Sequence, residues 1–286
     1  MKRALIALAA VGLAASLPAA ATQFFFSTGN ADGLMATASR PDAGGAFEIE
    51  SGDDFLLTNP TRIESATFQG LLTGNMSVAD IGEVRVEIYR VFPLDSDVGR
   101  TSGPPTFSTS QVPTRVNSPS DVALLDRDTG SGNLAFTTTD LGSFVASNSV
   151  TPGGIHPIPG QTTGGNGPAS GEQVTFNVDF TTPFTLAPGH YFFVPQVQST
   201  TSAGEFLWLS AAKPIAPPGT PFLPDLQSWT RDQFLDPDWL RVGTDIVGAG
   251  TFNAAFSLTG FVPEPASVAL IGIALAGLAL TRRRAA

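Results

Sequence analysis

The chain contains no cysteine, and only two of its 286 residues are histidine. The absence of cysteine excludes disulfide bonds, thiol nucleophiles and thiolate metal sites, so the core must stabilise the fold by itself. His156 and His190 both lie in turn-like sequence contexts, and neither is accompanied by a G-x-S-x-G or H-E-x-x-H motif. We therefore expect both histidines in surface loops, without a histidine-bound metal or a serine hydrolase triad.

Basic residues are scarce as well. The chain has 15 Lys and Arg against 25 Asp and Glu, which gives a formal net charge of −10. Residues 22–262 hold 10 of the basic and 24 of the acidic residues, and Lys213 is the single lysine among them. A surface of this sign repels phosphate backbones, so nucleic acid is excluded as a partner. It suits an exported protein that stays soluble, and it attracts cations.

Residues 1–21 carry the pattern of a secretory signal peptide. Two basic residues precede an apolar stretch over 4–17, and Ala19 and Ala21 form an A-x-A cleavage site before Thr22. The apolar stretch is too short for a permanent membrane span. We therefore predict that the export machinery and signal peptidase process the chain, with cleavage before Thr22.

The C-terminal end combines a short apolar run with a basic cluster. Fifteen uncharged residues, 266–280, are followed by Arg282, Arg283 and Arg284. As a helix the run spans roughly 22 Å at about 1.5 Å per residue, whereas a bilayer core of about 30 Å normally requires roughly 20 apolar residues. The run is marginal as a permanent span, and the positive-inside rule places the arginines at the cytoplasmic headgroups. The alternatives are an ordinary tail anchor and a buried core helix.

Pro263, Glu264 and Pro265 stand directly before this run. The order of triplet, apolar helix and basic terminus over 263–286 resembles the PEP-CTERM sorting signal of exported proteins in Gram-negative bacteria. The resemblance implies that exosortase, a membrane-embedded cysteine protease, recognises the triplet as its substrate and removes the tail. It also implies transient anchoring in the inner membrane, delivery to the cell surface or extracellular matrix, and an association with exopolysaccharide.

Residues 22–262 are dominated by alternation of period two, which is typical of strands with one buried face. The segments expected to form strands are 23–27, 47–58, 63–72, 83–89, 134–145, 174–180, 191–198, 206–210 and 252–258. No long helical period stands out between the termini. We therefore predict an all-β fold, an antiparallel β-sandwich or jelly-roll, flanked by the signal peptide and the short C-terminal hydrophobic helix.

A second resemblance concerns three short stretches of this region. DDFLL at 53–57, IESATFQG at 63–70 and FSLTG at 256–260 are similar to strands found in many PEP-CTERM proteins. This resemblance implies a β-sandwich module of uncharacterised function.

Two segments, 102–121 and 151–172, are rich in Gly, Pro, Ser and Thr and lack the alternation. They are interpreted as long mobile loops, or alternatively as linkers between two domains. The segment between them, 124–145, has the pattern of a hairpin within one sheet. This favours a single domain over 22–262.

The stretch DRDTGSGN begins with Asp126 and Asp128, spaced as in a calcium loop. It departs from an EF-hand because Gly130 and Thr137 occupy positions where acidic ligands are usual. An acidic β-turn is favoured over a loose calcium site. The adjacent acids of DDFLL are weaker candidates, because neighbouring strand residues point to opposite faces. We expect no cofactor, with calcium as the alternative.

The segment 228–239 gathers aromatic and acidic side chains around one arginine. Its candidate binding residues are Trp229, Asp232, Asp236, Asp238 and Trp239. Aromatic faces with carboxylates are typical of sugar-binding surfaces, and paired carboxylates serve glycoside hydrolysis when a cleft separates them. Packing in the core is the favoured interpretation of both tryptophans, as it is of Trp208.

Three functions are compatible with these features. The favoured one is an exported envelope or matrix protein of structural or adhesive type, without catalytic activity. The second is a glycan-binding module for exopolysaccharide that uses Trp229 and Trp239 as a platform. The third is a polysaccharide hydrolase that uses the acids of 232–238.

Overall fold

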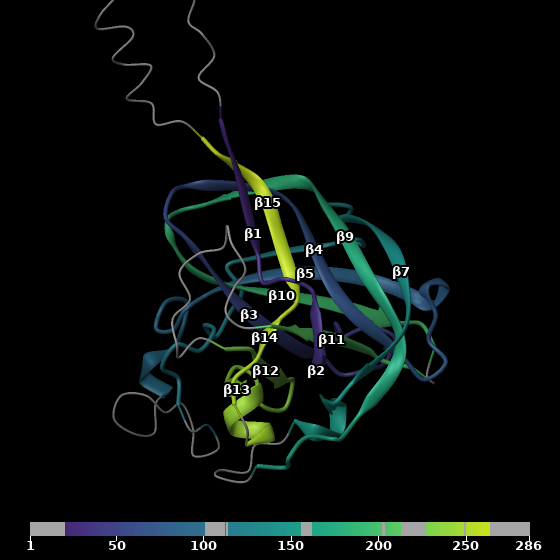
Figure 1. Cartoon of the computed structure of the whole chain (residues 1–286). Coiled ribbons are helices and arrows are strands. Elements are labelled where there is room, and N and C mark those ends of the chain that lie inside the picture. Colours follow the sequence, from purple (N-terminus) through teal and green to yellow (C-terminus); the bar gives the residue numbers. More distant parts are fainter. Residues whose placement is uncertain are drawn as a thin grey trace, which may run out of the picture.

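The computed structural model describes residues 21–100, 112, 114–155, 162–201, 204–212, 227–248 and 250–263. The predicted C-terminal hydrophobic helix and the arginine cluster lie outside the described residues, as do residues 1–20 of the predicted signal peptide. None of the helices within these ranges is long and apolar enough to cross a membrane. The fold is all-β, as the alternation predicted, with two sheets that enclose a common core (Figure 1).

Nine strands of the described chain form the first sheet. They are β1 (Thr22–Ser27), β2 (Ala31–Ala38), β4 (Thr61–Thr73), β7 (Ala135–Ala146), β8 (Asn148–Val150), β9 (Ala169–Leu186), β11 (Phe206–Ala211), β14 (Asn253–Ala254) and β15 (Phe256–Val262). The long strand β4 is its centre, pairing with β9 along one side and with β15 and then β11 along the other. The pairing of β2 with β8 is parallel, and the other strand pairs of this sheet are antiparallel.

Six antiparallel strands form the second sheet, in the order β13-β12-β3-β10-β5-β6. Their bounds are β13 (Leu240–Arg241), β12 (Trp229–Asp232), β3 (Ile49–Leu57), β10 (Gly189–Ser199), β5 (Ile81–Arg90) and β6 (Leu125–Asp128). The helical segments are short: 3₁₀ turns at Val78–Asp80, Val98–Arg100 and Pro152–Gly154, and a π-helical turn at Val242–Val247.

Aromatic rings fill the space between the sheets. Phe193 of β10 stacks on Phe256 of β15 with ring centroids 5.0 Å apart, and Phe68 of β4 stacks on Phe176 of β9 at 4.6 Å. All four side chains are buried. Burial of each contributes about 1.5–3 kcal/mol, so this core stabilises a chain that has no disulfide.

Every segment that the alternation assigned to a strand overlaps a strand of the structure. The segment 252–258 is divided by Ala255 into β14 and β15. The pattern missed β2, β8, β12 and β13. In β2 the run from Met35 to Ala38 is buried throughout, so the strand has no polar face that would give it a period of two.

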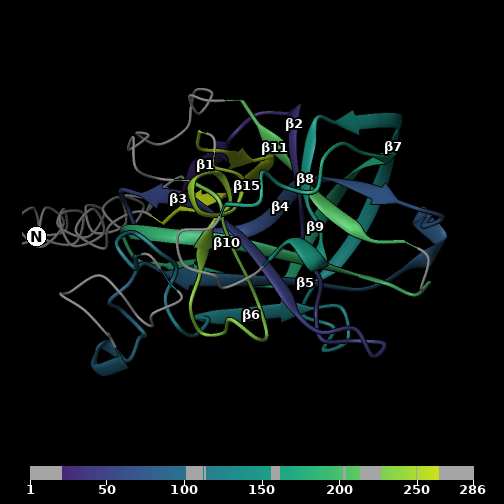
Figure 2. The same cartoon turned by 90° about the horizontal axis from the view of Figure 1, so that it is seen from below.

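The hairpin predicted for 124–145 is wrong. β6 pairs with β5 in the second sheet, whereas β7 pairs with β9 in the first. Figure 2 shows the two strands on opposite sides of the molecule. The residues between them therefore cross from one sheet to the other. Alternation identifies a strand and its buried face, but it does not choose the partner.

The described part of 102–121 has no regular secondary structure, as expected of a loop, but several of its side chains are buried. Arg115, Ser118, Ser120 and Asp121 are all buried. Together with residues 233–239 this segment covers the outer face of the second sheet, where Trp239 donates from Nε1 to the Ser120 carbonyl at 3.1 Å. Polar side chains made the segment look like a solvated loop, but their hydrogen bonds are internal.

Candidate functional site

The segment 228–239 forms β12 and the turn that follows it, next to β3 at the edge of the second sheet. The indole of Trp229 is 1 % exposed and that of Trp239 is 2 % exposed. Both pack with Tyr89, Phe192 and Val194 in a small core on the outer face of this sheet. The packing interpretation therefore fits the structure, and the sugar platform at these residues does not, because neither ring presents a face to solvent.

Arg231 is the centre of this cluster, and it is 4 % exposed. Its guanidinium forms a bidentate ion pair with Glu50, in which Nη2 lies 3.0 Å from Oε1 and Nε also donates to the carboxylate. It also donates to the Tyr89 hydroxyl at 3.0 Å. The group lies over the Trp239 ring at 4.4 Å. Charge, hydrogen bonds and ring contact thus fix Arg231 from several sides.

Nη1 of Arg231 holds the covering segments to the sheet. It donates to the carbonyls of Asp121 and Pro237, each at 3.1 Å, and lies 2.7 Å from the Asp236 carboxylate. Asp236 is the partly exposed member of the set, with half of its side chain open to solvent. The cluster is therefore a structural clamp between the sheet and its outer cover.

Two buried carboxyls beside Arg231 have opposite protonation behaviour. Burial opposes ionisation of Glu50, but the Arg231 guanidinium outweighs it and holds the pKa of Glu50 below its usual range. Burial, reinforced by the neighbouring Glu50 carboxylate, raises the pKa of Glu87 to about 9. Glu87 is therefore protonated at neutral pH, and the two carboxyls share a hydrogen bond. This avoids placing two negative charges in one buried site.

The remaining predicted acids are used in local contacts. Oδ1 of Asp232 accepts from the backbone N–H groups of Phe234 and Leu235 at 3.0 and 2.9 Å, which closes the turn after β12. Asp238 is buried and lies 2.9 Å from Arg100. Asp232 and Asp238 are thus used in a turn and an ion pair.

Glu50, Glu87 and Tyr89 complete the cluster, and the sequence did not single them out. Glu87 and Tyr89 belong to the polar positions of the alternating segment 83–89, which normally face water. Here the cover formed by 114–124 and 233–239 buries them. One sequence signal could have found these residues. Glu87 and Tyr89 lie on the polar face of one predicted strand, and the tryptophan-rich segment 228–239 carries an arginine that such a face could bind.

The calcium candidates Asp126 and Asp128 lie on β6. Asp128 accepts from the backbone N–H of Ser131 at 2.6 Å and from its hydroxyl at 2.7 Å, so it closes the turn after the strand. This geometry matches an acidic turn. In the described part of the chain, no group of three or more His, Cys, Asp or Glu side chains is arranged to hold a metal ion.

Asp53 and Asp54 point to opposite faces of β3, as predicted. Asp53 accepts from the backbone N–H of Ala254 at 2.7 Å, which connects the second sheet to the first. Asp54 lies 3.1 Å from Nε2 of His190.

His190 is on strand β10, so the expectation that it lies in a surface loop is wrong. His156 lies outside the described residues.

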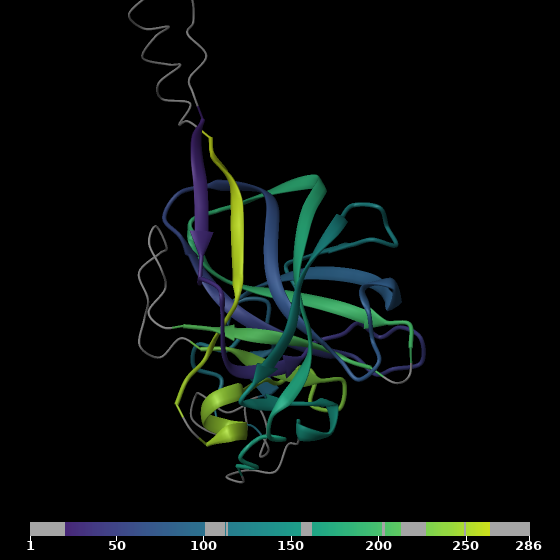
Figure 3. The same cartoon turned by 45° about the vertical axis from the view of Figure 1, so that its right-hand side comes forward.

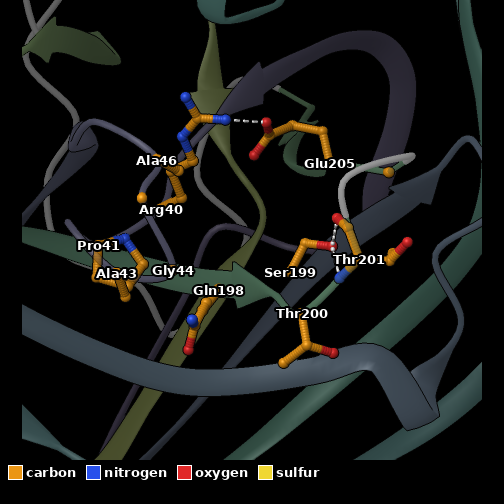
Figure 4. Close-up of a pocket in the computed structure, with 12 residues that line it drawn as sticks. Arg40, Pro41, Ala43, Gly44, Ala46, Gln198, Ser199, Thr200, Thr201 and Glu205 are labelled. Atoms are coloured by element: carbon orange, nitrogen blue, oxygen red, sulfur yellow. Dashed lines mark hydrogen bonds and ion pairs between the residues drawn. The ribbon is translucent and has the colours of Figure 1, made fainter.

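A polar pocket of about 500 Å³ lies between the β2–β3 loop and the end of β10 (Figure 4). Arg40 and Glu205 form an ion pair at one end, and Gln198 and Thr200 lie at the other. Burial raises the pKa of Glu205, although Arg40 opposes the shift. Oε1 of Gln198 accepts from the Glu83 N–H at 2.9 Å. The lining suits a small polar molecule: one oxygen of Glu205 is paired with Arg40, and the other is buried without a hydrogen-bond partner.

The first and last strands of the described chain lie side by side at one end of the first sheet. β1 and β15 run antiparallel from Thr22↔Val262 to Ser27↔Ser257. Figures 1 and 3 show both strands leaving the body side by side. The predicted signal cleavage position before Thr22 thus lies opposite the residue that precedes the triplet, and Pro263 is exposed. Glu264 and Pro265 lie outside the described residues.

Comparison with known families identifies the C-terminal segment. The family model of the PEP-CTERM protein-sorting motif matches residues 261–284. The match begins within β15 and includes the triplet, the apolar run and the arginines. No curated protein and no solved structure matches the chain. The chain therefore carries a PEP-CTERM sorting signal, which implies export, membrane-linked processing and sorting by exosortase.

Proposed function

We propose that this chain is an envelope or matrix protein of structural or adhesive type, without catalytic activity, whose sorting tail is temporary. In this proposal a Gram-negative cell exports the chain and signal peptidase releases Thr22. The inner membrane holds the protein by its C-terminal helix, and exosortase then cuts near Pro263. The β body passes to the cell surface or extracellular matrix.

The observation that carries the proposal is the position of the sorting motif relative to the fold. The matched segment starts at residue 261, inside the last strand. Val262 pairs with Thr22, the first residue after the predicted signal cleavage. Both processing positions therefore lie at one end of the sheet, where a membrane-embedded protease can reach the substrate without unfolding the core.

The geometry of the 228–239 segment supports a structural role for the body. Arg231, Glu50 and Trp239 form a closed clamp, and Asp232 and Asp238 are used in a turn and an ion pair. Burial of the two tryptophans removes the observation on which glycan binding at this segment rested. Exopolysaccharide remains a proposed partner without an assigned site, and calcium remains an untested ligand.

Mass spectrometry of the protein from a host that contains exosortase tests the processing. We expect a mature chain that begins at Thr22 and lacks residues 266–286. Replacing Pro263, Glu264 and Pro265 by alanine should leave the tail on the chain. Gln23→Ala is the matched control, because Gln23 is exposed at the same end of the sheet but outside the motif. A wild-type protein that keeps its tail in this host refutes the proposal.

A separate measurement tests the structural and non-catalytic part. Cells that lack the protein should lose surface cohesion, and the wild-type chain should restore it. Turnover of any polysaccharide by the purified protein, abolished by Asp236→Asn, would contradict the proposal. Asp236 is the informative position because its carboxylate is the partly exposed one beside Arg231.

A further inference from the structure

The end of the first sheet where the termini leave carries an aromatic and cationic tip on its outer face. Phe25 of β1 is 43 % exposed. Phe261 of β15 pairs with Gln23 on one side and with Arg62 of β4 on the other. The Arg62 guanidinium lies 5.5 Å from the centre of the Phe261 ring, and 43 % of its side chain is exposed. We call Gln23, Phe25, Arg62 and Phe261 the terminal tip.

The number of residues between this tip and the apolar run is small. β15 ends at Val262, and the uncharged run starts at Ala266. Val262 and Ala266 are four residue steps apart, which is at most about 14 Å when the chain is fully extended, at roughly 3.3–3.6 Å per residue. As long as the run is held in a membrane, the end of β15 therefore lies within about 14 Å of the position where the chain enters the lipid.

That distance is about twice the thickness of a lipid headgroup layer, so the end of β15 stays close to the headgroups. A bilayer of about 40–45 Å has a hydrocarbon core of about 30 Å, which leaves roughly 5–8 Å of headgroups on each side. The geometry points to an interaction of the terminal tip with the lipid headgroup surface while the tail is uncut. This inference rests on the membrane anchoring in the proposed function.

The side chains of the tip suit this environment. Exposed phenylalanine rings enter the boundary between headgroups and acyl chains, and an arginine beside them extends its charge to lipid phosphates. Glu64 lies 3.7 Å from Arg62, and both side chains are exposed, so the pair separates at little cost. The tip is close to neutral in a chain of net charge −10, and the acidic remainder of the body is repelled by anionic lipids.

The contact depends on the tether. Two partly exposed rings bury too little apolar area to hold a free protein on a bilayer, but a short covalent linker raises their effective concentration at the surface to the millimolar range. Cleavage near Pro263 removes the linker, so the tip should leave the membrane when the tail is cut. The tip thus orients the triplet at the bilayer surface before cleavage and does not retain the product.

Single cysteines test the inference, because the chain has none of its own. The uncut full-length chain is placed in vesicles of phosphatidylethanolamine and phosphatidylglycerol that contain a headgroup spin label. A fluorophore is attached at Gln23→Cys, or at Thr139→Cys as the control. Thr139 is exposed in the same sheet. It pairs with Thr175 of β9, which pairs with Gln69 of β4, and Gln69 lies about 23 Å along the strand from Arg62.

We expect at least two-fold quenching at position 23 and none at position 139. Phe25→Ser with Phe261→Ser should reduce the quenching at position 23 by half or more, and Phe25→Ser alone should act in the same direction. An unchanged melting temperature shows that the variants are folded. Truncation after Pro263 should abolish the quenching at position 23.

Each other result overturns the inference. A vesicle-bound chain without quenching at position 23 means that the tip faces another partner, such as the protease or a second copy. Quenching that the phenylalanine substitutions leave unchanged means that the linker alone sets the distance. A full-length chain that does not associate with the vesicles refutes the membrane anchoring of the proposed function as well, and so separates the two failures.

Discussion

Arg231 shows how a charged residue becomes a structural element when all its donors have acceptors. A buried guanidinium is costly unless its charge and hydrogen bonds are matched. Here Glu50 matches the charge, and carbonyls of two covering segments accept from Nη1. The same contacts account for the burial of Trp239, whose ring lies against the arginine. The cluster connects the sheet to segments that have little regular structure of their own.

Replacing Arg231 while keeping Glu50 should strongly destabilise the fold. We expect Arg231→Met to lower the free energy of unfolding by about 3–5 kcal/mol, because Glu50 is left buried without a counter-charge. Urea denaturation measures the change. Arg62→Met is the matched control, and its exposed side chain should make it nearly neutral. Adding Glu50→Gln to Arg231→Met should recover part of the loss; if it does not, the ion pair is not the cause.

Glu87 should make stability depend on pH. Its pKa is about 9 in the fold against an ordinary 4.5. Between these values the native state keeps a proton that the unfolded chain has released. The free energy of unfolding therefore falls as pH rises, by at most about 1.4 kcal/mol per pH unit.

Glu87→Gln should remove that dependence, because an amide is neutral at every pH and still donates to Glu50. We expect the variant to be more stable than the wild type at pH 8, with a difference that shrinks as the pH approaches 5. Urea denaturation at pH 5, 6, 7 and 8 measures it. Glu83→Gln is the control, as Glu83 pairs with Arg85 at the partly exposed start of β5. Parallel pH profiles for wild type and Glu87→Gln would contradict the assignment.

Among the elements, β4 has the most demanding packing. One edge of β4 has two different partners: β15 pairs with its first part, and β11 pairs with its last part. Phe206 of β11 crosses β4 at Gly70, where a Cβ atom would lie 1.9 Å from the ring. A residue without a side chain is required there because the aromatic ring occupies the space.

Gly70→Ala should therefore displace the Phe206 ring from the core and cost about 1–3 kcal/mol or more. Gly153→Ala is the control, because a Cβ atom there meets nothing within 4 Å. Thermal unfolding followed by circular dichroism compares the two. Equal melting temperatures would show that β11 moves freely past β4, contrary to the packing described.

At the scale of the whole molecule, the sorting motif and the predicted signal cleavage position both border the strand pair β1–β15. β1 lies at the edge of the first sheet and pairs with β15 over its whole length. Its side chains serve two environments. Phe26 is fully buried, with its ring 5.2 Å from Phe256, whereas Phe25 is 43 % exposed. The N-terminal strand therefore closes the core and presents one ring to the outside.

These two neighbours should respond differently to the same substitution. We expect Phe26→Ala to destabilise the protein by about 3–5 kcal/mol through loss of burial and creation of a cavity. Phe25→Ala should change stability by less than about 1 kcal/mol. Urea denaturation of both variants measures the difference. A large effect of Phe25→Ala would mean that another part of the protein covers this ring, and it would argue against the terminal tip as a free surface.

The sequence by itself determined the sorting motif, the fold class and most strands. A sorting motif is read by other proteins as a local order of residue types, so residues 263–286 could be recognised without a fold. Period-two alternation is also local, because successive strand residues point to opposite faces. This is why 174–180 and 83–89 were assigned correctly, with the buried face of each.

Tertiary structure decided what depends on contacts between distant segments. It placed β6 and β7 in different sheets, put His190 on a strand, and buried Glu87 on the polar side of its own alternation. It also turned Trp229 and Trp239 from candidate ligands into core residues. Alternation distinguishes the two faces of a strand. Residues that are distant in the sequence decide whether the polar face is exposed to water or covered by another segment.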